Sequence, residues 1–411
     1  MSSNLTTISV LAVALYAAGA HAEDAAAPMF SFSGFGTLGL VHSSEDKADF
    51  TGSVLKPHGA GYSRNWSAEV DSRIAAQVTA NLTPQLSAVL QVISEQNADN
   101  SYRPQVEWAN VKYQFTPDFS VRVGRAVQPA FLLSETRKVA YTYPWVRPPM
   151  EVYHLLPVTA NDGLDMSYRL HIGEWVNTLQ AQVGRKNTEL INNGGIAEAR
   201  NSWGISNTTE YGPLTTRIAY QKSHVTVASM NSLFNAFRQF GPQGDLIADK
   251  YDPDAKAYTS LGIGASYEPG NWFVMGEWGG VNTHSFIGKR SAWYVSGGFR
   301  VGEFTPYVTY AQVRADNLSD PGLTVSALPP FLAGEATGLN TALNSILRTK
   351  IAQNTLTIGG RWDFNKNTAL KLQFDHIRIG AGSTGALVNL QPGFQLGGKV
   401  NVFSATLDFV F

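Results

Sequence analysis

Apolar and polar side chains alternate strictly at the end of the chain, from Lys399 to Phe411. Successive side chains of a β-strand point to opposite faces, so a period of two gives one apolar and one mostly polar surface. The pattern therefore predicts an amphipathic final strand that ends on a phenylalanine. Its apolar face consists of Phe403, Ala405, Leu407, Phe409 and Phe411.

A second long alternation runs from Trp66 to Leu82. Apolar residues, Trp66 and Val70 among them, share one face, and charged residues such as Asp71 and Arg73 share the other. Strands of transmembrane barrels have such a lipid-facing and a water-facing side, and the segment is long enough to cross a bilayer. We expect one continuous membrane-spanning strand here.

Turn signals and polar connections divide the remaining chain in a regular rhythm. Seven tight turns lie at Thr83–Gln85, Thr116–Asp118, around Gly173, at Gly212–Pro213, Pro269–Asn271, around Gly302 and at Asn365–Asn367. Eight longer connections alternate with them, at Ser43–Asn65, Asn97–Pro104, Val127–Asn161, Lys186–Arg200, His224–Ala257, Val281–Arg290, Ala315–Gln353 and Gly380–Gly398. This arrangement predicts an all-β fold, a transmembrane antiparallel β-barrel of about 16 strands with an aqueous lumen.

The first residues have the pattern of an export signal. An apolar run from Ile8 to Ala18 precedes Ala20-His21-Ala22, an Ala-x-Ala cleavage pattern. The segment before the run lacks the usual Lys or Arg. We expect residues 1–22 to be a signal peptide and residues 23–411 to form the barrel domain.

Composition excludes several other kinds of site. The chain has no cysteine, so disulfides and thiolate metal sites are excluded, and a net charge of −1 gives no signal for nucleic acid. The eight histidines lack zinc-binding spacings. Gly34 to Gly39 fits a dinucleotide-binding pattern but lies within an alternating strand, where that motif has no helix to open. We expect no cofactor and no metal.

Three motifs and the chain end carry a resemblance to a known family. They are Gly34-Phe35-Gly36, Asp71-Ser72-Arg73-Ile74, Leu372-Gln373-Phe374-Asp375-His376 and the terminal Phe411. In their order and loop rhythm they resemble Gram-negative general porins, which are sixteen-stranded and usually trimeric. The resemblance implies a cell outer membrane location in contact with lipid, a homotrimer, and recognition of the C-terminal strand by the barrel assembly machinery.

In porins that this chain resembles, the third long connection folds into the barrel and constricts the pore. Here that connection is Val127–Asn161, which is rich in proline and aromatic residues and lacks the acidic, Gly-rich stretch frequent in the family. The alternative is an external loop at a trimer contact. Its candidate constriction residues are Glu135, Arg137, Lys138, Arg147 and Glu151.

Side chains alternate between the two faces of a strand, and this parity predicts which further charged residues face the inner wall. The basic candidates for the pore lining are Arg73, Arg169, Arg217, Arg300, Arg361 and Lys371. The acidic candidates are Glu69, Asp71, Asp165, Glu277, Asp363 and Asp375. Any single arginine could instead form a wall ion pair far from the narrowest point. Facing opposite charges would orient dipolar solutes, and we expect weak anion preference or near-neutral selectivity.

These features together predict a water-filled channel for passive diffusion of small hydrophilic solutes and ions. One alternative is a channel that prefers small anions or aromatic acids, because the third connection is basic and aromatic. A barrel enzyme of the outer membrane is a second alternative. It would need a positioned nucleophile or acid–base pair, and Asp375 and His376 are strand neighbours that point to opposite faces. We therefore expect no enzyme activity.

Overall fold

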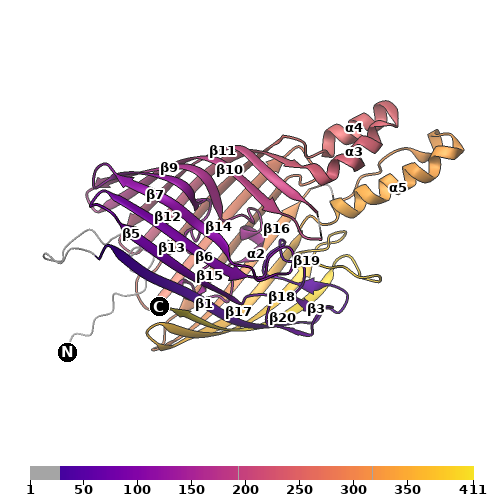
Figure 1. Cartoon of the computed structure of the whole chain (residues 1–411). Helices are drawn as coiled ribbons and strands as arrows, with labels where there is room; N and C mark the ends of the chain where they lie inside the picture. Colours follow the sequence, from indigo (N-terminus) through magenta and orange to yellow (C-terminus); the bar gives the residue numbers. More distant parts are fainter. Residues whose placement is uncertain (1–27, 193, 317) are drawn as a thin grey trace.

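The computed structural model describes residues 28–192, 194–316 and 318–411, which form one barrel with loops (Figure 1). The expected signal peptide, residues 1–22, lies outside the described residues and stays a prediction.

Sixteen long strands close into an antiparallel barrel, as the alternation predicted. The closing pair is the first and last strand, in register from Phe35–Val410 to Ser43–Val402. The strands are β1 (Phe30–Ser43), β5 (Arg73–Asn81), β6 (Leu86–Glu95), β7 (Gln105–Gln114), β8 (Phe119–Val127), β9 (Ala160–Ile172), β10 (Trp175–Glu189), β11 (Ile196–Tyr211), β12 (Leu214–Val227), β13 (Lys256–Tyr267), β14 (Trp272–Thr283), β15 (Arg290–Phe299), β16 (Phe304–Ala315), β17 (Gln353–Asn365), β18 (Thr368–Ile379) and β20 (Gly398–Val410).

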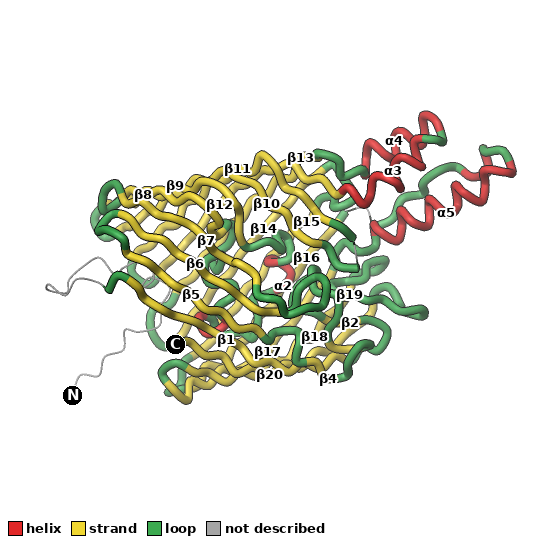
Figure 2. Tube along the Cα trace, in the orientation of Figure 1, coloured by secondary structure: helices red, strands yellow, loops and turns green. Residues whose placement is uncertain are grey.

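Tight turns and long loops lie at opposite ends of the barrel (Figure 2). In bacterial barrels the short turns face the periplasm and the longer loops face outward. Helices α3, α4 and α5 project beyond the barrel at the loop end (Figure 1). The elements within the loops are β2 (Asp49–Phe50), β3 (Ala60–Gly61), β4 (Trp66–Ser67), the 3-10 turn η1 (Ala140–Thr142), α2 (Met150–Tyr153), η2 (Ala228–Met230), α3 (Asn231–Arg238), α4 (Gly241–Tyr251), η3 (Val325–Ala327), α5 (Pro330–Leu347) and β19 (Leu387–Val388).

None of the helices within the described residues is long and apolar enough to span a membrane.

The expected strand from Trp66 to Leu82 is interrupted, so that prediction was wrong in part. β4 ends at Ser67 and β5 begins at Arg73. Between them Val70 is fully buried instead of facing lipid, and its carbonyl accepts a hydrogen bond of 2.9 Å from Lys56 Nζ. The interruption turns the chain toward the lumen, where Asp71 contacts the third loop.

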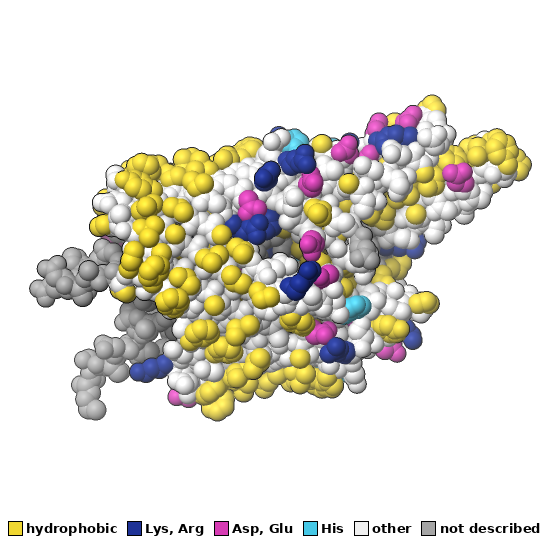
Figure 3. Space-filling model, viewed as in Figure 1, with side chains coloured by type: hydrophobic (Ala, Val, Ile, Leu, Met, Phe, Trp, Pro, Cys, Tyr) yellow, Lys and Arg dark blue, Asp and Glu magenta, His cyan; other side chains and the backbone are white. Residues whose placement is uncertain are grey.

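The outer wall is apolar and carries aromatic residues near the turn end. Figure 3 shows hydrophobic side chains spread over the outer face of the strands. Trp175 stacks on Tyr211 with ring centroids 4.3 Å apart, and Phe304 stacks on Trp362 at 5.5 Å. Aromatic rings favour the headgroup level of a bilayer. Other aromatic residues of the wall are also exposed on the surface, namely Trp66, Trp203, Trp278, Trp293, Tyr267 and Phe364, and Phe409 is half-buried.

Glycines in β1 receive the terminal phenylalanine rings of the closing strand. A Cβ atom at Gly34 would lie 2.2 Å from Phe411 Cζ, and one at Gly36 would lie 2.3 Å from Phe409 Cζ. Gly34 N also donates to the Phe411 carbonyl at 2.8 Å. The Gly-Phe-Gly motif therefore makes room for the rings that seal the barrel, in the manner of cross-strand aromatic–glycine pairs.

Candidate pore site

The third loop, residues 128–159, runs inside the barrel against the inner wall. Trp145 is 1% exposed, and its Nε1 donates to Ser296 Oγ at 3.0 Å and to Thr309 Oγ1 at 2.9 Å. Its ring lies edge-on to Tyr294, with centroids 5.8 Å apart. These wall residues belong to β15 and β16 and are buried, whereas their strand neighbours face outward. The loop is therefore packed on one side of the lumen.

Basic side chains of the wall hold this loop by its carbonyl groups. Lys371 on β18 is fully buried and donates to the carbonyls of Ala140 at 2.6 Å and Trp145 at 2.8 Å. Its ammonium also lies 2.8 Å from Asp408. Arg361 on β17 donates to two loop tyrosine carbonyls at 2.5 and 3.1 Å. Both residues face inward, as parity indicated, but the loop covers them.

Another basic residue fixes the start of the loop. Arg217 on β12 forms two hydrogen bonds to Glu135, at 2.8 and 2.9 Å, and a third to the Phe131 carbonyl at 2.6 Å. Nearby, Glu277 on β14 accepts a hydrogen bond of 2.5 Å from Tyr153. Two expected wall charges thus bind the loop.

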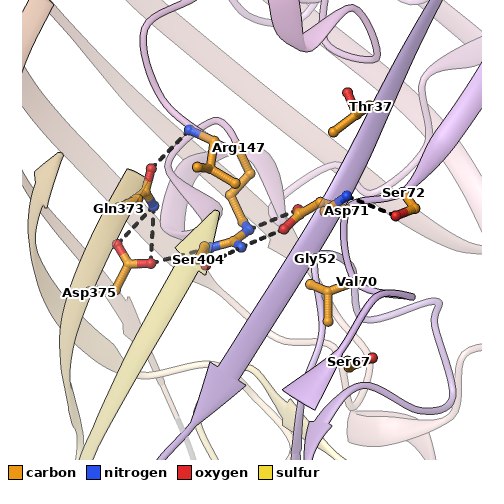
Figure 4. Close-up of polar contacts among 12 residues, drawn as sticks. Thr37, Gly52, Ser67, Val70, Asp71, Ser72, Arg147, Gln373, Asp375 and Ser404 are labelled. Atoms are coloured by element: carbon orange, nitrogen blue, oxygen red, sulfur yellow. Dashed lines mark hydrogen bonds and ion pairs between the residues drawn. The ribbon is translucent and has the colours of Figure 1, made fainter. Parts of the chain in front are cut away.

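Arg147 connects the loop to the seam between the first and last strands (Figure 4). Its guanidinium donates to both carboxylate oxygens of Asp71, at 3.0 and 2.6 Å, and lies 3.2 Å from Asp375. It also donates to Ser404 Oγ at 2.7 Å. The adjacent Val146 N donates to Gln373 at 3.0 Å. Arg147 is 6% exposed, so one buried cation is shared by two carboxylates.

The remaining charged loop residues differ in their surroundings. Arg137 donates to the carbonyls of Leu156 at 2.7 Å and Tyr153 at 2.8 Å. Glu151 in α2 is buried and accepts hydrogen bonds from Gln353 and Thr355. Burial raises the pKa of the Glu151 carboxyl, and these two hydrogen bonds partly oppose that shift.

Beside the loop lies an open cavity of about 500 Å³ between the loop and the wall of β5 to β8 and β10. Glu95 is one of its lining residues and lies within ion-pair distance of three cations. Lys138 forms ion pairs with Glu95 and, at 3.7 Å, with Glu107, while Lys56 and Arg73 each lie 3.8 Å from Glu95. The charged lining consists of Lys56, Arg73, Arg125, Arg137, Lys138, Arg147, Lys186, Asp71, Glu95, Glu107 and Glu189. Seven basic and four acidic side chains leave a local excess of three positive charges.

Of the basic residues nominated on the wall, Arg73 lines this cavity, Arg217, Arg361 and Lys371 hold the loop, and the other two, Arg300 and Arg169, lie elsewhere. Arg300 follows β15 in a tight turn and binds Glu268 at 2.7 Å and the Gly270 carbonyl at 2.6 Å. Arg169 lies on the inner face of β9 near the turn end, since its neighbour Tyr168 is exposed on the outer face. Neither residue contributes to the lining of the cavity beside the loop.

Several lining residues were missed by the sequence reading. Lys186 lies on β10, and extending the parity argument to that strand would have found it. Strict alternation would have missed Glu107 and Arg125, because it places them on the outer face with Val111 and Val123. Lys56 lies in the first loop, where no periodicity exists to indicate which way a side chain points.

Comparisons with known proteins agree with this architecture. A family model described as Gram-negative porin matches residues 7–382. The solved structure of Salmonella typhi OmpF in complex with daunomycin is similar with a TM-score of 0.56 and 12% identity, over 93% of this chain and 97% of that one. The outer-membrane expressed OmpT of Vibrio cholerae has a TM-score of 0.50 and 10% identity, over 95% and 100%. The search among curated proteins found no significant match.

The family match covers most of the chain, and the structural likeness extends to the whole barrel. The predictions of a porin-type barrel, of an outer-membrane location and of a channel for passive diffusion of small solutes are thereby confirmed. The chain belongs to the Gram-negative porin family.

Proposed function

We propose that the third loop forms the constriction of this diffusion channel and that the open path beside it prefers anions weakly. The observation that carries the proposal is the lining of the 500 Å³ cavity, with seven basic and four acidic side chains. Solutes would pass between the loop and the wall of β5 to β8 and β10.

The preference is expected to be weak because much of the positive charge is paired. Glu95 and Glu107 neutralise part of the charge of Lys138, and Asp71 pairs with Arg147. Fixed charges act more strongly in a narrow lumen than in bulk water, so a small excess still biases the ions that enter. The local balance matters more than the net charge of −1 of the whole chain.

Charge reversal at Lys186 tests this proposal. Lys186 lines the cavity from β10, so Lys186→Glu should shift the reversal potential in a KCl gradient toward cations. Lys399→Glu is the matched control, because Lys399 is exposed on the outer face of β20 and changes the total charge equally. Equal reversal potentials for wild type, Lys186→Glu and Lys399→Glu would contradict an ion path along this wall.

We infer a general preference for small anions over a specific one for aromatic acids. Three of the four loop aromatics that suggested aromatic solutes, Tyr143, Trp145 and Tyr153, are between 1% and 3% exposed, and the fourth, Tyr141, is half-buried. Their rings pack on the loop and wall and offer little surface to a solute. Benzoate and acetate should therefore show similar relative permeability, and strong selection of benzoate would contradict this inference.

We propose further that the channel is a homotrimer whose final strand is recognised by the barrel assembly machinery. The support is the family membership, the apolar outer wall at the β1–β20 seam, and the exposed Phe411 at the chain end. A heat-labile oligomer on unheated gels is expected, and a strictly monomeric mass in mild detergent would contradict the trimer. Deleting Phe411 should reduce insertion into the outer membrane.

We propose that the chain has no enzymatic activity. Asp375 is buried on the inner face and bound to Arg147, whereas His376 is on the outer face and its Nδ1 lies 2.7 Å from Asn401. These neighbours therefore cannot act as one acid–base pair. Hydrolysis of phospholipid or peptide by the purified protein would contradict this proposal.

A further inference from the structure

Two buried hydrogen-bond acceptors belong to residues that line the cavity beside the third loop, and neither has a donor among the described residues. They are Gln96 Oε1 and His154 Nδ1. Both side chains are only 3% exposed. A buried polar atom without a partner destabilises the fold, so such atoms beside a cavity mark positions where a bound molecule can donate hydrogen bonds.

The first acceptor lies where the barrel wall meets the second loop. Gln96 directly follows β6, which ends at Glu95. Its Nε2 donates to Asn100 Oδ1 at 2.9 Å, and this contact leaves Oε1 as the free acceptor of the amide. Asn97 Nδ2 donates to the Arg103 carbonyl at 3.0 Å and so fixes the same loop. The position of the Gln96 side chain is therefore set by the protein itself.

The second acceptor lies on the third loop. His154 follows α2, and its Nε2 lies 3.3 Å from the Gly52 carbonyl. A carbonyl oxygen can only accept, so Nε2 carries the proton and Nδ1 carries a lone pair. Burial, together with the positive charge of Arg137, lowers the pKa of His154 to about 4. The ring is therefore neutral at pH 7, and Nδ1 is an acceptor there.

A cation is available in the same lining. Lys186 lines the cavity from β10, and its ammonium makes no hydrogen bond or ion pair with the residues that the structure describes. Lys56 and Lys138, by contrast, are already ion-paired with Glu95. A lysine ammonium is a compact charge that can pair with a carboxylate. The lining thus combines an available cation with two available acceptors.

These three groups define the chemistry of a matching solute. The cation calls for an anionic group, and the acceptors call for hydrogen-bond donors. An ammonium donor is disfavoured, because basic side chains outnumber acidic ones by seven to four in this lining. Hydroxyl groups donate without adding positive charge. A cavity of about 500 Å³ has the size of a site for a small molecule.

We propose that Gln96, His154 and Lys186 form a binding site for small hydroxylated carboxylates in the cavity beside the third loop. The carboxylate of the solute pairs with Lys186, and its hydroxyl groups donate to Gln96 Oε1 and His154 Nδ1. A carboxylate without hydroxyl groups leaves both acceptors unpaired and binds less tightly. The inference rests on the proposed ion path through this cavity.

Block of the chloride current by glycerate and by propionate tests the site. The two monocarboxylates have the same carbon chain, but only glycerate carries hydroxyl groups. One ordinary hydrogen bond changes affinity by a factor of about three to ten. Glycerate should therefore block single wild-type channels at about tenfold lower concentration than propionate. Gln96→Met and His154→Leu should each raise the half-blocking concentration of glycerate by about three- to tenfold and leave that of propionate unchanged.

The controls separate the site from the channel itself. Gln239→Met is the matched control, since Gln239 is exposed after α3, and it should block like the wild type. Equal block by glycerate and propionate in an anion-preferring wild type would overturn the site and leave the channel proposal intact. A cation-selective wild type would overturn both. An unchanged glycerate block in Gln96→Met and His154→Leu would also overturn the site, and either variant suffices if the other fails to fold.

Discussion

Replacing Arg147 with methionine should loosen the third loop where it contacts Asp71, Asp375 and Ser404, while Arg361 and Lys371 still hold the neighbouring part of the loop. The change removes the contacts of 2.6 Å to Asp71, 3.2 Å to Asp375 and 2.7 Å to Ser404. It leaves two carboxylates buried without their cation. Removing one partner of a buried ion pair costs about 3–5 kcal/mol. A loss of about 4 kcal/mol shifts the ratio of docked to undocked loop by about a thousandfold.

Single-channel recording in a planar bilayer measures this change. The wild type should show steady ohmic steps, because Arg217, Arg361 and Lys371 hold the loop on the wall in addition to the contacts of Arg147. The Arg147→Met channel should show larger mean conductance and frequent partial closures as the loop moves in the lumen. Urea should increase the current noise of the variant at lower concentration than that of the wild type.

A paired substitution provides the control. The double variant Arg147→Met, Asp71→Asn removes one of the two carboxylates that would be buried without a cation. The conductance of this variant should therefore lie closer to that of the wild type. The loss of Arg147 destabilises Asp375 less than Asp71, because Thr357 and Gln373 also donate hydrogen bonds to Asp375. If Arg147→Met has the conductance and noise of the wild type, the network does not hold the loop and the reasoning is refuted.

Three further outcomes are expected. Burial lowers the pKa of Lys56 to about 8, so the anion preference should fall between pH 7 and pH 9, and Lys56→Gln should abolish that dependence of the reversal potential. Burial lowers the pKa of His154 to about 4 in the docked loop. In an undocked loop His154 would bind a proton below about pH 6.5, so acid favours the undocked loop. Docking should therefore weaken by up to about 3 kcal/mol near pH 4. Current noise should rise there in wild type but not to the same extent in His154→Leu. Gly36→Val would place a side chain into the Phe409 ring and should lower the yield of folded barrel on gels. Gly360→Val on β17, where an added Cβ has nothing within 4 Å, is the control and should leave the yield unchanged.

The barrel could be predicted from sequence because the membrane imposes a strict rule on each strand. A lipid-facing position must be apolar, so alternation alone located the final strand from Lys399 to Phe411. Its polar face was expected to meet water but is buried, because Arg147 of the third loop contacts Ser404 and Lys371 of the wall pairs with Asp408. The rule fails where the chain leaves the wall. Val70 fits the alternation but belongs to a buried loop cluster, because the chain turns inward before β5.

The candidate site was less predictable than the barrel. Parity predicts which side of the wall a residue faces, but it does not predict whether a loop covers that residue. Lys371 and Arg361 face inward, but loop carbonyls occupy their donors. Arg147 was expected to set selectivity, and its contacts with Asp71 give it a part in loop docking instead. Such pairings join residues 76 positions apart, which no local pattern encodes.

The loop helices also escaped prediction. α3 and α4 pack on each other and on α5 through a separate apolar cluster that includes Phe234, Phe237 and Leu343. The sequence predicted only long connections there and no helices. The packing that stabilises these helices depends on contacts between two different loops, which no local pattern indicates.

The zero-current potential of the wild-type channel in a KCl gradient tests the central claim most directly. The cavity beside the third loop carries an excess of three positive charges, so the potential should have the sign of a weakly anion-preferring pore at neutral pH. Raising the ionic strength should bring it closer to zero, because salt screens the fixed charges. A strongly cation-selective potential, or the absence of ohmic conductance, would contradict the account.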